Sequence, residues 1–231
     1  MNEAAFDALK TYDWGVEPNV LQPLTDAVVT THGNAAARLE LEIQLAAVLK
    51  TDVPRAAKDA VCRLLKPIGT AASVPTLAAL LADEKLSHMA RYALELMPAP
   101  EAGEALRAAL PKVGGKLKIG VISSLGVRGD AAGVAPLQAL LADGDPAIAR
   151  AAAYALGAIG SPEANAALAA AKASPATRAA MADASLACAE ELLATDRKPA
   201  AKATYQRLLG GKPSKLVEQA AARGVKACEG R

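Results

Sequence analysis

The chain has 231 residues, of which 52% are apolar but only 3% aromatic, and its formal net charge is +2 at pH 7. Acidic and basic residues are interspersed, which argues against the strongly cationic surface typical of proteins that bind nucleic acid or anionic membranes. No segment approaches the roughly 18 uncharged apolar residues that a membrane span requires.

The beginning of the chain carries Glu3 where a secretory signal would carry Lys or Arg. We therefore expect a soluble protein without a signal peptide, either cytoplasmic or exported after removal of a signal. The three cysteines, Cys62, Cys188 and Cys228, are far apart and form neither a disulfide framework nor a metal knuckle. We expect Cys62 and Cys188 to be small buried apolar residues.

The helical spacing of the apolar residues, together with residues typical of helix starts and ends, predicts an all-α protein without strands. The expected helices cover residues 3–12, 19–32, 34–50, 54–67, 72–82, 86–97, 101–112, 116–126, 132–142, 146–158, 162–172, 176–194, 198–209 and 213–228. The first 33 residues contain Phe6, Tyr12 and Trp14. These aromatic side chains are interpreted as a terminal cap over the core, with an aromatic binding patch as the alternative.

Proline and glycine mark where the expected helices begin and end. Pro146 follows Asp145, a combination favoured at the first turn because the Asp side chain caps free amides. We expect Gly126, Gly157 and Gly160 to end helices, because glycine adopts the left-handed cap at little cost.

A repeat of about thirty residues organises the chain. Leucines that close the second helix of each pair are 29, 31, 31 and 30 residues apart: Leu65, Leu94, Leu125, Leu156 and Leu186. Leucines of the first helices interleave with them: Leu45, Leu77, Leu106 and Leu137. A period of this length with two helices per unit predicts an α-solenoid of stacked antiparallel helix pairs. We expect a single domain over residues 1–231, with an N-terminal cap (1–33), repeats (34–195) and a C-terminal helical cap (196–231).

The segment Asp145-Pro-Ala-Ile-Ala-Arg-Ala-Ala-Ala-Tyr-Ala-Leu-Gly-Ala-Ile-Gly160 resembles the second helix of a HEAT repeat. It is most similar to the short HEAT-like units of the phycobilin lyase superfamily and of many bacterial multidomain proteins, and residues 120–130 and 88–94 are further copies. The resemblance covers roughly residues 35–190. It implies a right-handed superhelix in which the second helices line a concave binding wall, but it does not specify a function.

Helical geometry then predicts which residues of the second helices face outward. Counted from the closing leucine, positions −8, −5, −4 and −1 share the buried stripe, and positions −6, −3 and −2 point away from it. The outward positions contain a candidate binding strip: Asp59, Arg63, His88, Arg91, Tyr92, Arg150 and Tyr154. Tyr and Arg are enriched at interaction surfaces. The alternative interpretation is an ordinary solvated helix face.

Signals of catalysis are sparse. His88 and Asp59 fall in one column of successive units and could form an acid–base pair, although a plain surface or packing histidine is the simpler reading. No nucleophile triad, phosphate-binding glycine loop or metal-spaced cluster is present in the sequence. We therefore expect no catalytic residues, no metal and no cofactor.

Two groups of basic residues could contact phosphate or could be ordinary solvated surface. One comprises Lys112, Lys116 and Lys118. The other is terminal and comprises Arg197, Lys198, Lys202, Arg207, Lys212 and Lys215.

The leading hypothesis is a non-enzymatic scaffold that binds another protein or peptide, either as a whole or as part of a larger multidomain protein. One alternative is an enzyme of the bilin lyase or isomerase kind, which the resemblance alone suggests. Another is nucleic-acid binding by a HEAT-like fold of the alkylpurine glycosylase kind, which the mixed charge of the strip disfavours. The sequence leaves the partner, the compartment and the oligomeric state open.

Overall fold

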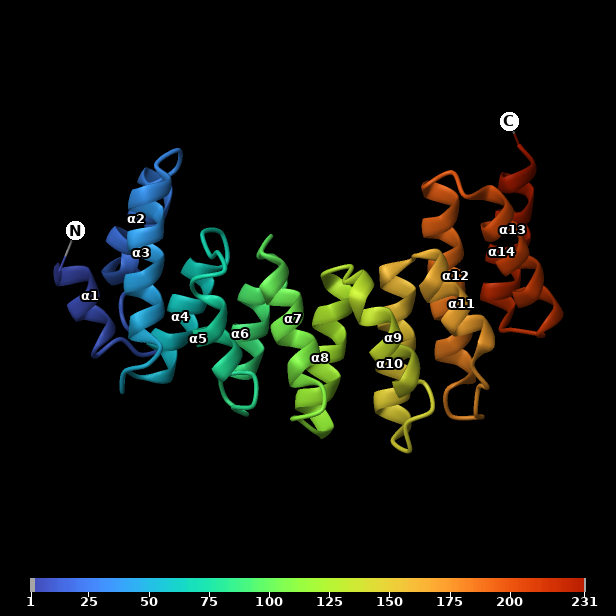
Figure 1. The fold of residues 1–231 in the computed structure, drawn as a ribbon, viewed down its shortest axis with the longest axis horizontal. Helices are drawn as coiled ribbons and strands as arrows, with labels where there is room; N and C mark the ends of the chain where they lie inside the picture. Colours follow the sequence, from blue (N-terminus) through green and yellow to red (C-terminus); the bar gives the residue numbers. More distant parts are fainter. Residues whose placement is uncertain (1–2, 231) are drawn as a thin grey trace. The chain divides into compact units, whose positions relative to one another are not determined.

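The computed structural model describes residues 3–230, and within this range it consists of 14 α-helices and two short 3-10 helices (Figure 1). Residues 3–230 contain no strand. Each of the helices expected from the sequence has a counterpart, with boundaries that differ by a few residues. The predicted all-α solenoid class is confirmed.

The chain divides into two compact units, an N-terminal unit of residues 1–117 and a C-terminal unit of residues 118–231. Helix α8 (Gly115–Val127) contributes residues to both. The expectation that the whole chain is one domain stays a prediction.

In the N-terminal unit, successive helix pairs pack side by side in two layers. Helices α3, α5 and α7 contact one another in sequence, and α4 packs on α6 in the second layer. Helix α2 packs on both α3 and α4 at the N-terminal end. The elements are α1 (Glu3–Leu9), η1 (Pro18–Leu21), α2 (Gln22–Thr30), α3 (Ala35–Val48), α4 (Arg55–Leu65), α5 (Val74–Ala79), α6 (Ser87–Leu94) and α7 (Pro100–Ala109).

The C-terminal unit repeats this arrangement. Helices α9 and α11 form one layer, α10 and α12 the other, and the terminal hairpin of α13 and α14 packs on α12 (Figure 1). This hairpin confirms the helical structure predicted for the C-terminal cap. The elements are η2 (Ala131–Gly133), α9 (Val134–Leu140), α10 (Pro146–Ile159), α11 (Pro162–Ala170), α12 (Arg178–Ala194), α13 (Lys198–Gly210) and α14 (Lys215–Glu229).

The repeated leucines form the core of each unit. All of those in the two series are fully buried except Leu186, which is half-buried. The neighbouring Ser185 is buried instead. The predicted register of α12 is therefore wrong by one residue, and Ser185 occupies the position that Leu156 holds in α10.

Glycines inside the second helices allow these helices to approach one another closely. A Cβ on Gly126 would lie 2.8 Å from Ala155 Cα, and a Cβ on Gly157 would lie 2.9 Å from Ala184 Cα. Both glycines lie in the last turn of their helices, as expected, but neither has the positive φ of a left-handed cap. Gly160 is the left-handed cap of α10, as predicted, with φ of 64°.

The buried carboxylate of Glu42 joins α3 to the turn before α5. Its Oε1 accepts hydrogen bonds from the backbone N–H groups of Thr70 and Ser73 at 2.6 and 3.1 Å. Its Oε2 accepts a third from the Thr70 hydroxyl at 2.9 Å. Glu42 therefore satisfies amides that would otherwise be left without partners ahead of a helix.

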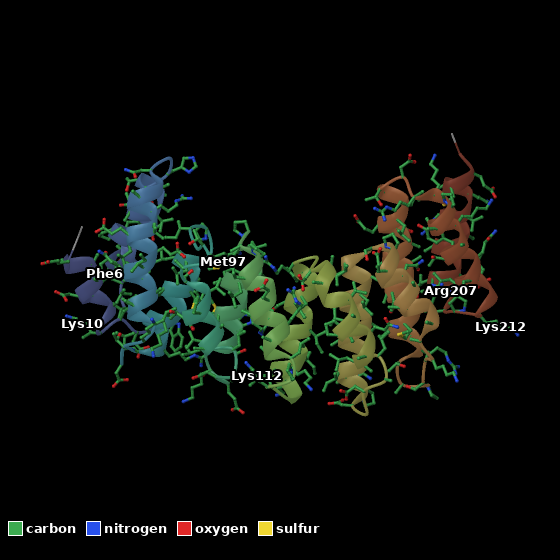
Figure 2. The ribbon with its side chains drawn as sticks, in the orientation of Figure 1. Phe6, Lys10, Met97, Lys112, Arg207 and Lys212 are labelled. Atoms are coloured by element: carbon green, nitrogen blue, oxygen red, sulfur yellow. The ribbon has the colours of Figure 1, made fainter. Side chains whose placement is uncertain are left out.

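The aromatic residues of the N-terminal segment do not all cover the core. Trp14 is 57% exposed, while Phe6 and Tyr12 are half-buried. For Trp14 the capping prediction is wrong, because Leu9, Leu21 and Leu24 fill the core at this end. Phe6 extends from α1 (Figure 2). Among residues 3–230, no helix combines the length and apolarity needed to cross a bilayer.

Candidate functional site

The position two residues before the closing leucine faces solvent in α4, α6, α8 and α10, as predicted, but in α12 the residue at this position, Ala184, is buried. Arg63 on α4, Tyr92 on α6 and Tyr154 on α10 are all exposed, and so is Ser123 on α8. Tyr154 is 51% exposed and Tyr92 is 37% exposed, high values for such large side chains. Of the candidate strip, this column and His88 on α6 are exposed and available to a partner.

The position three residues before the closing leucine is buried, contrary to the prediction. Cys62, Ile122 and Ala153 are inaccessible to solvent. A second helix packs both on its own first helix and on the next second helix, which widens its buried arc beyond one stripe. The half-exposed Ala60 and Ala151, at position −5, show that the accessible face is rotated toward that side.

Asp59 was expected on the exposed strip but is 5% exposed. Burial raises the pKa of its carboxyl group, and the nearby positive charges of Arg55, Arg63 and His88 oppose that rise. Within residues 3–230, Asp59 Oδ1 has no hydrogen-bond partner. Asp59 therefore lies near enough to His88 for the two charges to interact, but its Oδ1 makes no hydrogen bond to the imidazole.

Two arginines of the strip are engaged within the protein. Arg91 forms an ion pair with Glu95 at 3.9 Å, and its side chain is only 14% exposed. Arg150 is half-buried, and its Nη1 donates to the carbonyl oxygen of Ala176 at 3.3 Å. This contact ties α10 to the loop before α12, so both arginines have a structural contact besides any role at a surface.

Two cations lie over aromatic rings beside Arg63. The Lys66 ammonium is 3.6 Å from the centre of the Tyr92 ring, and the Arg55 guanidinium is 5.3 Å from that of Trp14. Sequence reasoning missed Arg55 and Lys66 as surface residues. A signal existed, because Arg55, Arg63 and Lys66 recur at the i, i+8 and i+11 spacing of one helix face.

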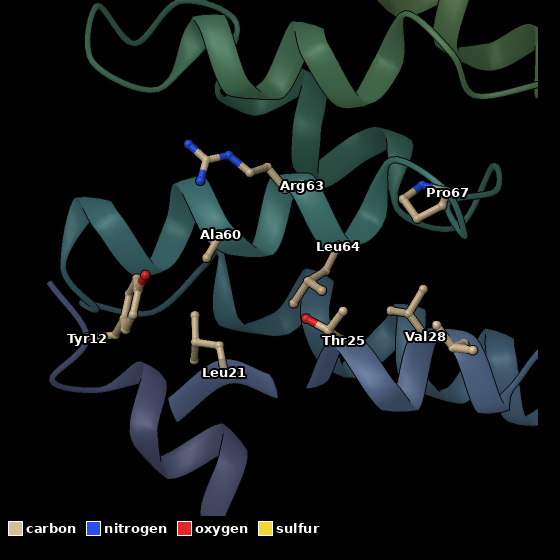
Figure 3. Close-up of a pocket in the computed structure, with 9 residues that line it drawn as sticks. Tyr12, Leu21, Thr25, Val28, Ala60, Arg63, Leu64 and Pro67 are labelled. Carbon is tan, nitrogen blue, oxygen red and sulfur yellow. The ribbon is translucent and has the colours of Figure 1, made fainter. Parts of the chain in front are cut away.

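A groove of about 370 Å³ lies between the N-terminal elements and α4 (Figure 3). Ala60 and Leu64 point from α4 toward Leu21 and Thr25, while Arg63 runs along the outer side of the helix (Figure 3). The lining is mostly apolar: Tyr12, Leu21, Thr25, Val28, Val29, Ala60, Arg63, Leu64 and Pro67.

The C-terminal unit has a groove of its own between α8 and α10. It measures about 340 Å³, and Tyr154 lies in its wall together with Ile119, Ser123 and Val127. The two tyrosines of the strip thus belong to separate units, with Arg63 and Tyr92 in one and Tyr154 in the other.

The two buried cysteines are poor nucleophiles. Burial raises the pKa of the Cys62 thiol to about 12 and that of Cys188 to about 11, so neither is a ready nucleophile. In the described part of the chain, no three His, Cys, Asp or Glu residues are grouped so as to hold a metal ion.

The terminal basic residues make internal contacts. Lys202 pairs with Glu229 at 2.8 Å, and Lys198 Nζ donates to the Gly230 carbonyl oxygen at 3.2 Å. Arg207 donates to Asn165 Oδ1 at 3.4 Å. The Glu229 carboxylate thus offsets the charge of Lys202, while Lys198 and Arg207 keep their charges and are held by neutral acceptors.

Comparison with known proteins gives a family for the repeats. Residues 114–187 match the family of HEAT repeats. The chain is similar to the crystal structure of an engineered protein (19% identity over 90% of this chain and 96% of that one, TM-score 0.43). It is also similar to human deoxyhypusine hydroxylase (17% identity over 90% of this chain and 95% of that one, TM-score 0.36).

No curated protein matches this sequence. The finer resemblance to the phycobilin lyase type stays a prediction. The matched segment contains α8 to α11 and most of α12. Residues 114–187 of this chain are therefore HEAT repeats.

Proposed function

We propose that this chain is a non-enzymatic module that binds another protein through the exposed outer face of its second helices. The observation that carries the proposal is that each unit presents large side chains to solvent at the position two residues before the closing leucine, Arg63 and Tyr92 in the N-terminal unit and Tyr154 in the C-terminal unit. Arg and Tyr are the residue types that most often dominate binding energy at protein interfaces.

The surroundings of this column support binding better than catalysis. Arg63 and Tyr154 each border an apolar groove, so an arriving side chain can be buried beside a polar anchor. The side chains nearest to an acid–base pair, His88 and Asp59, are not joined in a geometry that moves a proton.

Affinity capture from a lysate of the source organism tests the proposal with a double variant, Tyr92→Ala with Tyr154→Ala. Both side chains are exposed, so the fold should be retained, and circular dichroism would verify this. We expect proteins captured by the unmodified chain to be recovered at about a tenth or less with the double variant, since interface tyrosines often contribute 2 kcal/mol or more.

The matched control is Leu216→Ala, which removes a large apolar side chain that is 79% exposed on α14, outside the column. It should capture the same proteins as the unmodified chain. Equal recovery by the double variant and the control would show that the column is not the binding surface.

A further inference from the structure

The outer face of α4 is positively charged over its whole length. Arg55, Arg63 and Lys66 are exposed or half-exposed along it, and His88 of α6 lies nearby. Asp59, the carboxylate on the same face, is buried, so an arriving partner meets the cations rather than the acid. Within residues 3–230, Arg63 forms no ion pair that would neutralise it.

The two flanking cations are held in place by aromatic rings. The cation–π contacts of Lys66 with Tyr92 and of Arg55 with Trp14 restrain long side chains that would otherwise be mobile. Restraint before binding lowers the entropy that must be lost on association. We call Trp14, Arg55, Arg63, Lys66, His88 and Tyr92 together the basic aromatic face.

The carboxylates close to Trp14 in the sequence accept hydrogen bonds from residues of their own segment. Asp13 Oδ1 accepts a hydrogen bond from the Trp14 backbone N–H at 2.8 Å, and Glu17 accepts one from the Asn19 side chain at 3.3 Å. Neutral donors leave both carboxylates charged, so they partly offset Arg55 near Trp14, whereas Arg63 and Lys66 lie at the other end of α4.

An apolar groove borders the basic aromatic face directly, and Arg63 belongs both to this face and to the lining of the groove. Its volume of about 370 Å³ lies near the lower end of the roughly 300–1,000 Å³ range of ligand pockets. Leu21, Val28 and Leu64 supply apolar walls that favour an aliphatic or aromatic side chain. A partner that fits must therefore combine negative charge with an apolar anchor.

We infer that the basic aromatic face and its groove bind an acidic segment of a partner protein, with Asp or Glu side chains on Arg63 and its neighbours and one apolar side chain in the groove. This inference rests on the proposed function and specifies the partner's chemistry. A nucleic acid fits less well, because bases bind by stacking on open rings and a cation already covers one face of each ring.

Fluorescence anisotropy with an array of labelled synthetic peptides tests the inference. The peptides are rich in Asp and Glu and carry Leu, Phe or Trp at varied positions; the comparison probes are lysine-rich counterparts, purely acidic peptides and a single-stranded oligonucleotide. We expect the acidic peptides with an apolar residue to bind most tightly, and their affinity to fall as salt is raised.

Variants locate the binding on the surface. Arg63→Glu should weaken the best acidic peptide by about tenfold or more, because reversal places like charges together. The matched control is Lys112→Glu, the same charge change at an exposed residue outside the face (Figure 2). It should alter affinity less than twofold, in line with the small effect of remote surface charges.

The groove is tested by Ala60→Leu, which fills it from α4. This variant should lose the preference for peptides with an apolar residue while still binding purely acidic ones. If Arg63→Glu disturbs folding, Arg63→Gln, which removes the charge without reversing it, replaces it in the test of the charged face.

The inference is overturned if no acidic peptide binds, if lysine-rich peptides or the oligonucleotide bind as tightly, or if Arg63→Glu behaves like Lys112→Glu. The proposed function fails separately. If the Tyr92 and Tyr154 double variant loses captured proteins that Arg63→Glu retains, the protein-binding role stands and the acidic partner does not.

Discussion

Replacing Glu42 with Ala should lower the free energy of unfolding by about 3 kcal/mol, a large part of the roughly 5–15 kcal/mol that stabilises most proteins. The change removes three hydrogen bonds to a buried carboxylate and leaves the N–H groups of Thr70 and Ser73 without their acceptor. Hydrogen bonds to charged groups contribute about 1.5–3 kcal/mol each, and unsatisfied buried donors add a penalty. Urea unfolding followed by circular dichroism measures the loss.

Two further variants test whether the lost hydrogen bonds of Glu42 cause the loss of stability. Glu42→Gln keeps an oxygen acceptor for the amides and should lose only about 1 kcal/mol. Glu40→Ala, two residues earlier on the exposed side of α3, should change stability by no more than about 0.5 kcal/mol. If Glu42→Ala were as mild as Glu40→Ala, the carboxylate would not be what joins α3 to the turn before α5.

Replacing Gly157 with Ala should destabilise the C-terminal unit by about 1–3 kcal/mol, although alanine is the better helix former by about 1 kcal/mol. The new Cβ would lie 2.9 Å from both the Cα and the carbonyl oxygen of Ala184. These are backbone atoms, so α10 and α12 must move apart to accept the methyl group. Thermal unfolding followed by circular dichroism detects the change.

The control is Gly210→Ala at the last residue of α13, where a Cβ would meet no heavy atom within 4 Å. This variant should be neutral or more stable by up to about 1 kcal/mol, because only helix propensity changes. Opposite signs for the two substitutions support close helix packing at Gly157. A stabilising Gly157→Ala would instead mean that the helices are not in contact there.

Much of the fold is predictable because the repeat fixes which apolar residues are shared between neighbouring helices. The closing leucines Leu65, Leu94, Leu125 and Leu156 reveal both the helix pairs and their burial. The register of α12 is not predictable in this way, since Ser185 occupies the core position next to a conspicuous Leu186. Gly126 and Gly157 are also wrongly predicted as left-handed caps. The sequence alone does not distinguish a glycine that lets a neighbouring helix approach from one that caps a helix.

The candidate site is only partly predictable, for a different physical reason. Sequence spacing gives the direction of a side chain from its own helix, and this places Arg63, Tyr92 and Tyr154 correctly at the surface. It does not give the width of the contact with the next helix, and that contact buries Asp59. The stacking of Lys66 on Tyr92 joins residues of different helices, which no periodicity within one helix reveals.

The most direct test of the account is the rate at which the native protein's cysteines react with a thiol reagent. Second helices bury Cys62 beside the exposed Arg63 and Ala153 beside the exposed Tyr154, so Cys62 should be protected. Desolvation raises the pKa of all three thiols, but Cys62 and Cys188 are buried, whereas Cys228 is half-exposed and accessible to the reagent. One thiol of the three should therefore react in the folded protein, and all three after unfolding in urea. Reaction of Cys62 as fast as Cys228 in the folded protein would contradict the orientation of α4 on which the proposed binding surface depends.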